Sequence, residues 1–99
     1  MPAKTYVKRP VKIEAIQFNG KADFAEVREF TEGKFILITE ADRRGNSGWG
    51  PSITAAVHDR LHDTWVGVKD GQFIIKGIQG EFYPHDEALF PEVYDEVWA

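Results

Sequence analysis

The sequence predicts one α+β domain over residues 1–99, with a mostly antiparallel sheet, one helix in the N-terminal half and a short C-terminal helix. Several short segments are rich in β-branched and aromatic residues, and some of them alternate apolar and polar residues as half-buried strands do. One early segment instead spaces its apolar residues as a helix does. A chain of 99 residues without repeats or linkers has room for a single domain.

The first predicted strand follows a proline. Val11, Ile13 and Ala15 alternate with charged residues, which is the period of two that a half-buried strand requires. Pro10 cannot donate a hydrogen bond to a neighbouring strand. It therefore marks either the beginning of this strand or its exposed edge.

A helix and a second strand are expected next. Residues 24–31 have apolar positions at helical spacing, with Asp23 as the N-cap and Gly33 in the place of a C-terminal cap. Residues 34–39 are β-branched and aromatic, which is typical of a strand buried on both faces. The predicted order up to this point is strand, helix, strand.

The middle of the chain predicts one long loop and two strands. Residues 40–51 break every periodic pattern and contain three glycines and a proline, so we expect an irregular loop, a class that is often mobile or functional. Residues 53–58 and 64–69 read as strands, and residues 60–63 as the turn between them.

Asp70-Gly71 is the strongest turn signal in the chain, and it predicts a tight hairpin between residues 65–68 and 73–75. Gly77 and Gly80 predict a further bend, although Gly-x-x-Gly also occurs in the nucleic-acid-binding loop of KH domains. A KH domain would place a helix on each side of that loop, whereas here a strand precedes it. We therefore favour a turn.

The C-terminal part predicts a short acidic helix that begins at His85 or Asp86 and continues through Leu89 to Phe90, with Pro91 limiting or kinking it. Large apolar side chains follow this helix and are expected to dock on the domain. They are Tyr94, Val97 and Trp98.

Charge is concentrated at the two ends of the chain. Residues 1–12 carry four cations and no acid, whereas residues 81–99 carry six carboxylates and no Lys or Arg. The two ends either face each other or solvent, or pair between subunits in a head-to-tail or two-fold oligomer. The net charge of −4 opposes nucleic-acid binding, and no apolar run is long enough to predict contact with a membrane.

The side chains that could act in catalysis or bind a metal predict neither an enzyme nor a metal site. The absence of cysteine excludes disulfides, thiol catalysis and thiolate zinc sites, and we expect no cofactor. His58 and His62 have the spacing of metal ligands on a helix, but they lie where a strand and a turn are predicted. Three carboxylates could serve as a general acid and base, but the sequence shows no recognisable nucleophile and no paired catalytic motif with them. They are Glu81, Asp86 and Glu87.

Arginine and tryptophan in the predicted loop suggest a binding surface. Paired guanidiniums bind phosphate, glycine amides form anion sites, and a tryptophan stacks on bases or anchors protein interfaces. Tyr83, Trp98 and Trp49 are the aromatic residues that we expect to stay partly exposed. The candidate partner- or ligand-binding residues are Arg43, Arg44, Trp49, Tyr83 and His85.

Most of the chain resembles a family of small bacteriophage and prophage proteins, notably those of actinobacteria. The resemblance rests on residues 9–18 and on a motif in the second half of the chain, Trp65-Val66, Asp70-Gly71, Phe73-Ile74-Ile75-Lys76-Gly77 and Gln79-Gly80-Glu81-Phe82-Tyr83-Pro84. It implies synthesis in the cytoplasm of an infected bacterium and no family-wide catalytic residue. Many relatives have cysteine at the position of His85, which argues against a metal or catalytic role for that histidine.

The leading hypothesis is a non-enzymatic phage protein that binds and modulates a bacterial host protein, in host takeover or superinfection exclusion. Small accessory phage proteins often act in this way, and the arginine and tryptophan loop suits a protein interface. The alternative is an anti-defence protein that sequesters a nucleotide-like signalling ligand through Arg43, Arg44 and Trp49. A homodimer is compatible with both hypotheses.

Overall fold

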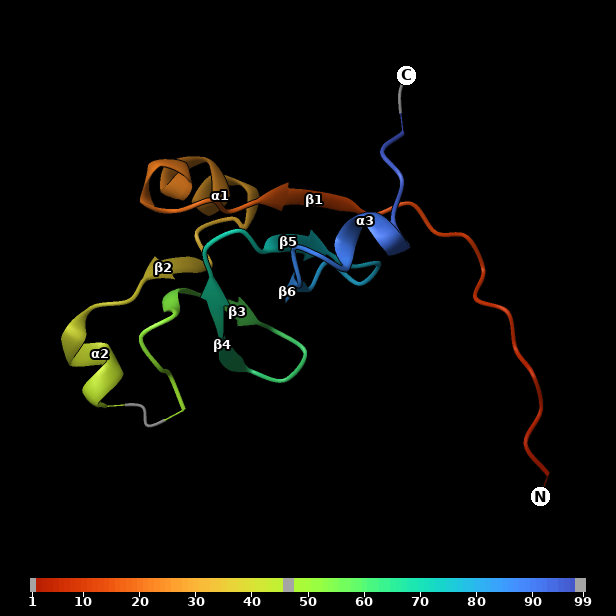
Figure 1. The fold of residues 1–99 in the computed structure, drawn as a ribbon, viewed down its shortest axis with the longest axis horizontal. Coiled ribbons are helices and arrows are strands. Elements are labelled where there is room, and N and C mark those ends of the chain that lie inside the picture. Colours follow the sequence, from red (N-terminus) through yellow and green to blue (C-terminus); the bar gives the residue numbers. More distant parts are fainter. Residues whose placement is uncertain (1, 46–47, 98–99) are drawn as a thin grey trace.

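Two three-stranded antiparallel sheets form the framework of the computed structural model, which describes residues 2–45 and 48–97. The sheets lie one above the other in Figure 1. The first sheet has the order β1–β5–β6, and the second has the order β2–β3–β4. Their strands are β1 (Glu14–Gln17), β5 (Phe73–Lys76), β6 (Phe82–His85), β2 (Phe35–Leu37), β3 (Ile53–Asp59) and β4 (Thr64–Lys69). The predicted α+β class with mostly antiparallel sheets is confirmed.

The hydrophobic core lies between the two sheets. Phe18, directly after β1, packs edge-on against Phe35 of β2 with 5.0 Å between the ring centroids, so the two sheets share one aromatic contact. The inward side chains of the other strands complete this cluster because alternate residues of each strand face the same side. The buried members are Phe18, Val27, Phe35, Ala55, Val57, Val68, Ile74 and Phe82.

Helix α1 (Phe24–Phe30) contributes Val27 to this core, as its apolar spacing predicts. A single 3-10 turn, η1 (Lys21–Asp23), leads into it. Asp23 occupies the N-cap position, but its carboxylate accepts a hydrogen bond from the backbone N–H of Asn19 and not from the helix. Gly33 ends the helix at a φ of 85°, and its N–H donates to the carbonyl of Arg28. The predicted helix and its glycine cap are confirmed.

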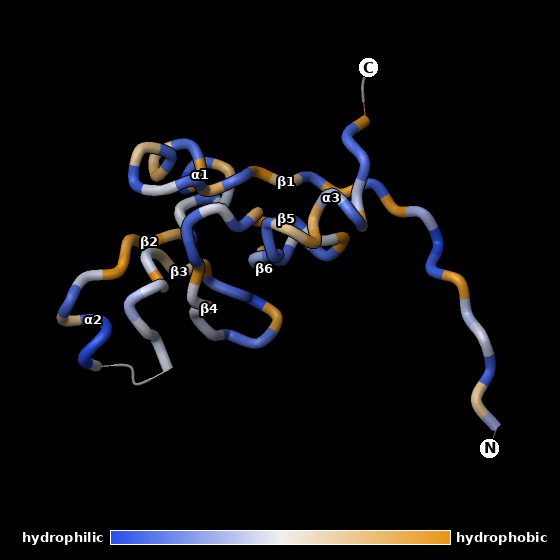
Figure 2. The backbone as a smooth tube through the Cα atoms, viewed as in Figure 1, coloured by the Kyte–Doolittle hydropathy of each residue, from blue (hydrophilic) through white to orange (hydrophobic). Residues whose placement is uncertain are grey.

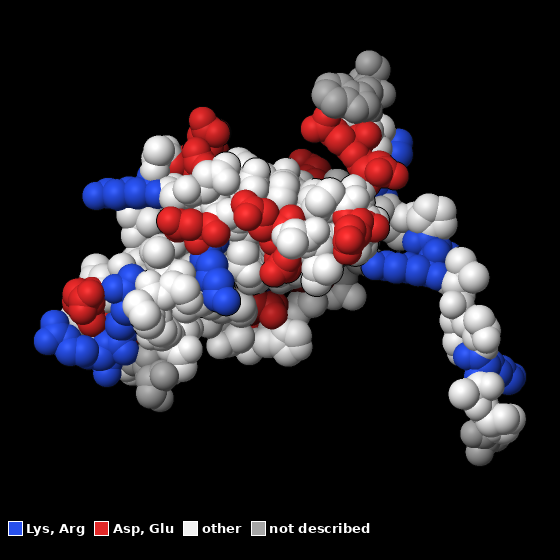
Figure 3. Space-filling view, in the orientation of Figure 1, with Lys and Arg blue, Asp and Glu red and all other residues white. Residues whose placement is uncertain are grey.

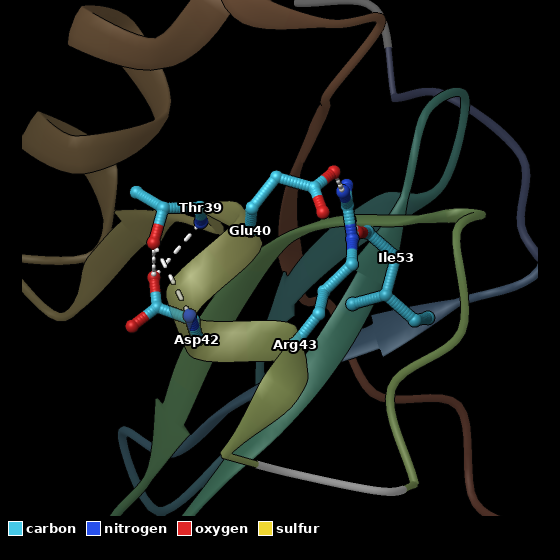
Figure 4. Close-up of polar contacts among 5 residues, drawn as sticks. All are labelled: Thr39, Glu40, Asp42, Arg43 and Ile53. Carbon is cyan, nitrogen blue, oxygen red and sulfur yellow. Dashed lines mark hydrogen bonds and ion pairs between the residues drawn. The ribbon is translucent and has the colours of Figure 1, made fainter.

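The expected irregular loop begins with a helix, α2 (Glu40–Arg44), so that part of the loop prediction is wrong. A reciprocal cap nucleates the helix: the Thr39 hydroxyl accepts from the backbone N–H of Asp42, and the Asp42 carboxylate accepts from the backbone N–H of Thr39 (Figure 4). Asp at the third helical position replaces the more usual Glu or Gln of this box. Part of the predicted loop, residues 46–47, lies outside the described residues.

The predicted hairpin at Asp70-Gly71 is wrong, because this turn carries the chain from one sheet to the other. β4 pairs with β3, whereas β5 pairs with β1 and β6. Gly71, at a φ of 95°, donates its N–H to the carbonyl of Phe18, and Phe18 donates to the carbonyl of Gln72. A turn signal shows where the chain reverses but not which strand edges then pair. The bend at Gly77 and Gly80 is confirmed as the connection from β5 to β6.

The first strand begins at Glu14, three residues later than the alternation from Val11 predicts. Residues 2–13 run before it without secondary structure, and residues 2–12 are all exposed. We call residues 2–13 the arm. It extends away from the sheets in Figure 1, and Figure 2 shows hydrophilic and hydrophobic residues alternating along it. The radius of gyration of 15.2 Å exceeds the roughly 13 Å usual for this length.

The C-terminal helix is also shifted relative to its prediction. α3 (Phe90–Val93) begins where the predicted helix ends, because the Asp86 carboxylate accepts from the N–H groups of Ala88 and Leu89 and fixes a turn instead. Pro91 lies in the first turn of α3, where its missing N–H costs nothing. Of the expected docking residues, Tyr94 packs on the domain, Val97 is 68% exposed, and Trp98 lies outside the described residues.

Candidate functional site

The five candidate residues fall into two groups on opposite sides of the two-sheet sandwich. Arg43, Arg44 and Trp49 belong to α2 and the segment after it, beside the outer face of the second sheet. Tyr83 and His85 lie on β6, with their side chains on the outer face of the first sheet. The structure does not bring these two groups together, so each outer face is a separate candidate site.

Trp49 packs over the outer face of the second sheet at Gly67 of β4. A Cβ atom at position 67 would lie 3.2 Å from the indole Nε1 of Trp49 and 3.0 Å from the Cγ2 of Ile53. Both distances are shorter than ordinary van der Waals contact. Glycine at position 67 therefore lets the tryptophan approach the sheet, and the neighbouring Ala56 of β3 is fully buried.

Trp49 and Trp65 line a shallow hollow of about 570 Å³ together with Ile36 of β2. The hollow is also lined by Ala41 and Asp42 of α2, by Gly45 directly after it, and by Asp63 and Thr64 at the start of β4, and we call it the tryptophan hollow. Trp65 is 39% exposed and Ile36 is 38% exposed. The exposure of Ile36 contradicts the prediction that residues 34–39 are buried on both faces. Apolar and aromatic surface is therefore accessible at this point on the second sheet.

Two carboxylates border the tryptophan hollow, at Asp42 and Asp63. Hydrogen bonds from the backbone and the hydroxyl of Thr39 lower the pKa of Asp42 below its ordinary value of 3.8, so its carboxylate is ionised at neutral pH. The side chain of Asp63 is 95% exposed, and its Oδ1 lies 3.1 Å from the Nε2 of His58. A ligand in the hollow would thus meet negative charge beside two indole rings.

Arg43 is occupied within the protein and does not face the hollow as a free cation. Its Nε and Nη2 atoms donate to the carbonyl of Ile53 at 3.3 and 3.0 Å, and its Nη1 lies 3.1 Å from the carboxylate of Glu40 (Figure 4). These bonds tie α2 to the start of β3. Arg44 is exposed and has no ion pair among residues 2–45 and 48–97. The pair of guanidiniums expected to hold a phosphate is therefore not assembled.

On the opposite side, α3 is held to the first sheet by aromatic rings. Phe90 stacks on Phe73 of β5 with 3.9 Å between centroids, and His85 meets Phe90 and Tyr94 edge-on at 5.6 and 5.8 Å. Tyr83 lies beside them, and burial, followed by the neighbouring Tyr94, raises the pKa of its phenol above 10.0. His85 thus packs among aromatic rings.

The histidines that suggested metal ligation each contact an aspartate. Besides the contact between His58 and Asp63, the Nδ1 of His62 lies 2.7 Å from Asp59, whose pKa this hydrogen bond lowers. Across the part of the chain that the structure describes, His, Asp and Glu side chains do not gather in groups of three that could hold a metal ion. These four residues close the turn between β3 and β4, where Asp59 also accepts the N–H of Leu61.

The acidic residues weighed as a catalytic pair also have structural partners. Glu87 accepts a hydrogen bond from the side-chain amide of Gln17, which donates to the carbonyl of Gly71 as well. Asp86 fixes the turn before α3, and Glu81 accepts from the backbone of Gln79. None of these contacts places two carboxylates on a common substrate position.

No helix within the described residues has both the length and the apolar sequence needed to cross a membrane. Comparison of the chain with protein-family models, with curated proteins and with solved structures found no match.

Proposed function

We propose that the chain is a non-enzymatic phage protein that binds a bacterial host protein, and that its tryptophan hollow takes an Arg or Lys side chain of that protein. One observation carries this proposal: two tryptophans and two carboxylates line the same accessible hollow. The phage origin and the location in the infected bacterial cytoplasm rest on the sequence resemblance described above.

An indole ring attracts a cation placed over its face, with about 0.5–2 kcal/mol per contact depending on how far the pair is desolvated. Asp42 and Asp63 add Coulombic attraction at the rim of the hollow. Ile36 supplies apolar contact for the methylene groups of the same side chain. Tryptophan is also the residue type that most often dominates the binding energy of protein interfaces.

The same geometry disfavours the nucleotide-like ligand. A phosphate in the hollow would lie beside two carboxylates, whereas neither Arg43 nor Arg44 lines the hollow and the guanidinium of Arg43 is committed to Glu40 and to the carbonyl of Ile53. Like charges in a partly desolvated site repel. We therefore propose the protein partner alone.

The experiment is affinity capture from the bacterial host with tagged wild type, Trp65→Ala and Asp63→Asn, followed by mass spectrometry. Leu61→Ala is the matched control, because Leu61 is an exposed apolar residue that does not line the hollow. We expect a host protein that is captured by wild type and the control, and whose affinity falls at least about tenfold with either hollow variant. The next step replaces Arg and Lys residues of the captured protein one at a time.

Capture of nothing, or equal capture by all four proteins, would contradict the proposal. Asn tolerates the positive φ of 47° at position 63, so Asp63→Asn removes the charge and keeps the turn. Thermal unfolding of each variant shows whether lost capture reflects a lost fold.

A further inference from the structure

The arm exposes apolar and basic side chains that have no partner in their own domain. Tyr6 and Val7 are 83% and 89% exposed. None of the arm cations forms an ion pair with any described residue; they are Lys4, Lys8, Arg9 and Lys12. The accessible surface of the whole chain is 7514 Å², about 1,800 Å² more than the roughly 5,700 Å² usual for a monomer of this mass.

A groove of about 900 Å³ lies beside the base of the arm, on the outer face of the first sheet. Residues 8–13 of the arm form one side, and α3 with the chain after it forms the other. The apolar lining includes several exposed residues, Val11, Ile78, Val93 and Val97. The side formed by α3 and the chain after it carries the carboxylates of Asp95 and Glu96, Glu81 lines the floor, and the side formed by the arm carries Lys8, Arg9 and Lys12.

The charge of the arm is opposite to that of the C-terminal side of the groove. Figure 3 shows Lys and Arg side chains spaced along the arm, and Asp and Glu side chains clustered on the C-terminal segment. Within the described residues, the carboxylates of Asp95 and Glu96 have no cation as a partner. The two segments thus have opposite charge, and both lack the ion pairs that their charges would allow.

The first residues of the arm, 2–7, do not line their own groove. Proline fixes φ at position 10 and restricts Arg9 to extended conformations, which keeps the chain extended where it leaves the groove. The arm of a second copy begins at another point in space, so it can reach this groove without folding back on its own chain. In a two-fold arrangement the exchange is reciprocal, because the same surfaces meet twice.

We propose that the chain forms a two-fold dimer in which residues 2–9 of each copy lie across the groove of the other. Lys4 and Lys8 meet the carboxylates of Asp95 and Glu96, while Tyr6 and Val7 cover the apolar lining. The excess surface of about 1,800 Å² per chain is enough to supply a standard interface, which buries about 1,600 Å² in total. This face is opposite the tryptophan hollow, so the proposal does not depend on the proposed function.

The test is sedimentation velocity of the full-length protein over a range of concentrations at low and high salt. Wild type is compared with Lys4→Glu/Lys8→Glu and with Asp95→Lys/Glu96→Lys. The matched control, Lys21→Glu/Lys34→Glu, reverses two exposed cations outside the arm. We expect the wild type and the control to form dimers whose dissociation constant rises with salt concentration. We expect that dissociation constant to be at least about tenfold higher for each of the other two variants.

Mixing the two double variants provides the decisive measurement. Each then presents an arm whose charge is opposite to the C-terminal side of the groove of the other, so we expect the mixture to form a heterodimer at concentrations at which neither variant dimerises alone. A monomeric wild type, a dimer insensitive to the arm substitutions, a mixture that stays monomeric, or open polymers that lengthen with concentration would each overturn the proposal. Loss of dimerisation with unchanged host capture would leave the proposed function intact.

Discussion

Individual side chains decide which predicted site residues are free to bind. Arg43 and Arg44 are adjacent and equivalent in the sequence, yet Arg43 holds the carbonyl of Ile53 whereas Arg44 is exposed. Trp65 belongs to the hollow although its position in a strand favoured the core. A strand pattern identifies two faces but not which of them faces solvent. Of the residues that line the hollow, the sequence therefore singled out Trp49 but not Trp65, Ile36 or the two carboxylates.

Gly67→Ala tests the contact between Trp49 and the second sheet. The added methyl group lies within 3.2 Å of Trp49 and Ile53, so we expect a loss of about 1–3 kcal/mol in the free energy of unfolding. Trp49 should also move toward solvent, which shifts the tryptophan emission to longer wavelength. Both effects are measured in urea titrations followed by fluorescence.

Gly50→Ala is the control for this substitution, because a Cβ atom at position 50 meets nothing within 4 Å. We expect its stability to stay within about 0.5 kcal/mol of wild type. If Gly67→Ala behaved in the same way, Trp49 would not pack as described.

Among the secondary-structure elements, local hydrogen bonds determine where the helices begin. Sequence periodicity alone identifies short helices poorly. α2 has five residues, too few for an apolar period, and its only sequence signature is Thr39 followed by Asp42. Strands were predicted more accurately: residues 53–58 and 64–69 correspond to β3 and β4. The pairing of β5 was not predicted correctly: β5 pairs with β1 and not with β4, and partners such as Ile16 and Ile74 are remote in sequence.

Asp42→Asn tests the cap of α2 through its dependence on pH. The folded state lowers the pKa of Asp42, so its charged form stabilises the fold above 3.8, and this contribution is lost as the pH falls through the folded pKa. We expect Asp42→Asn to lower the Tm at neutral pH and to match wild type in acid below the folded pKa. Differential scanning calorimetry from pH 7 to about 2 measures this convergence.

Glu29→Gln serves as the comparison, because Glu29 is an exposed helical carboxylate without a side-chain hydrogen bond among the described residues. Its Tm should follow that of wild type over the whole range. A constant gap between Asp42→Asn and wild type down to the lowest pH would show that charge on Asp42 does not support the cap.

For the whole molecule, a single core joins the two sheets, so they should unfold together. Phe18 is completely buried and contacts Phe35 across the interface between the sheets. The length of the chain and its lack of linkers predicted a single domain. The alternation of apolar and polar residues did not predict two sheets, because the pattern of a strand is the same whichever neighbour it pairs with.

Phe18→Ala is expected to cost about 3–5 kcal/mol of unfolding free energy, from lost burial and from the cavity that remains. In a Trp98→Phe background the remaining tryptophans, Trp49 and Trp65, lie at the second sheet, so their fluorescence reports on that sheet, while far-ultraviolet circular dichroism reports on both sheets. The two transitions should coincide in wild type and in the variant. Separate midpoints in wild type would mean that the sheets do not share one cooperative core.

Because the chain crosses from one sheet to the other between β4 and β5, at Gly71, the paired strands of the two sheets differ in their separation along the sequence. Val57 and Val66, which pair within the second sheet, are nine positions apart, whereas Ile16 and Ile74 of the first sheet are 58 positions apart. Closing the longer loop costs about 1.6 kcal/mol more in chain entropy. We therefore expect the β3–β4 pair to form before β1 pairs with β5. In a full-length chain whose other strands have already paired, the residues up to Gln17 would still be unattached, so we expect a neighbouring copy to capture this segment more easily than any other strand.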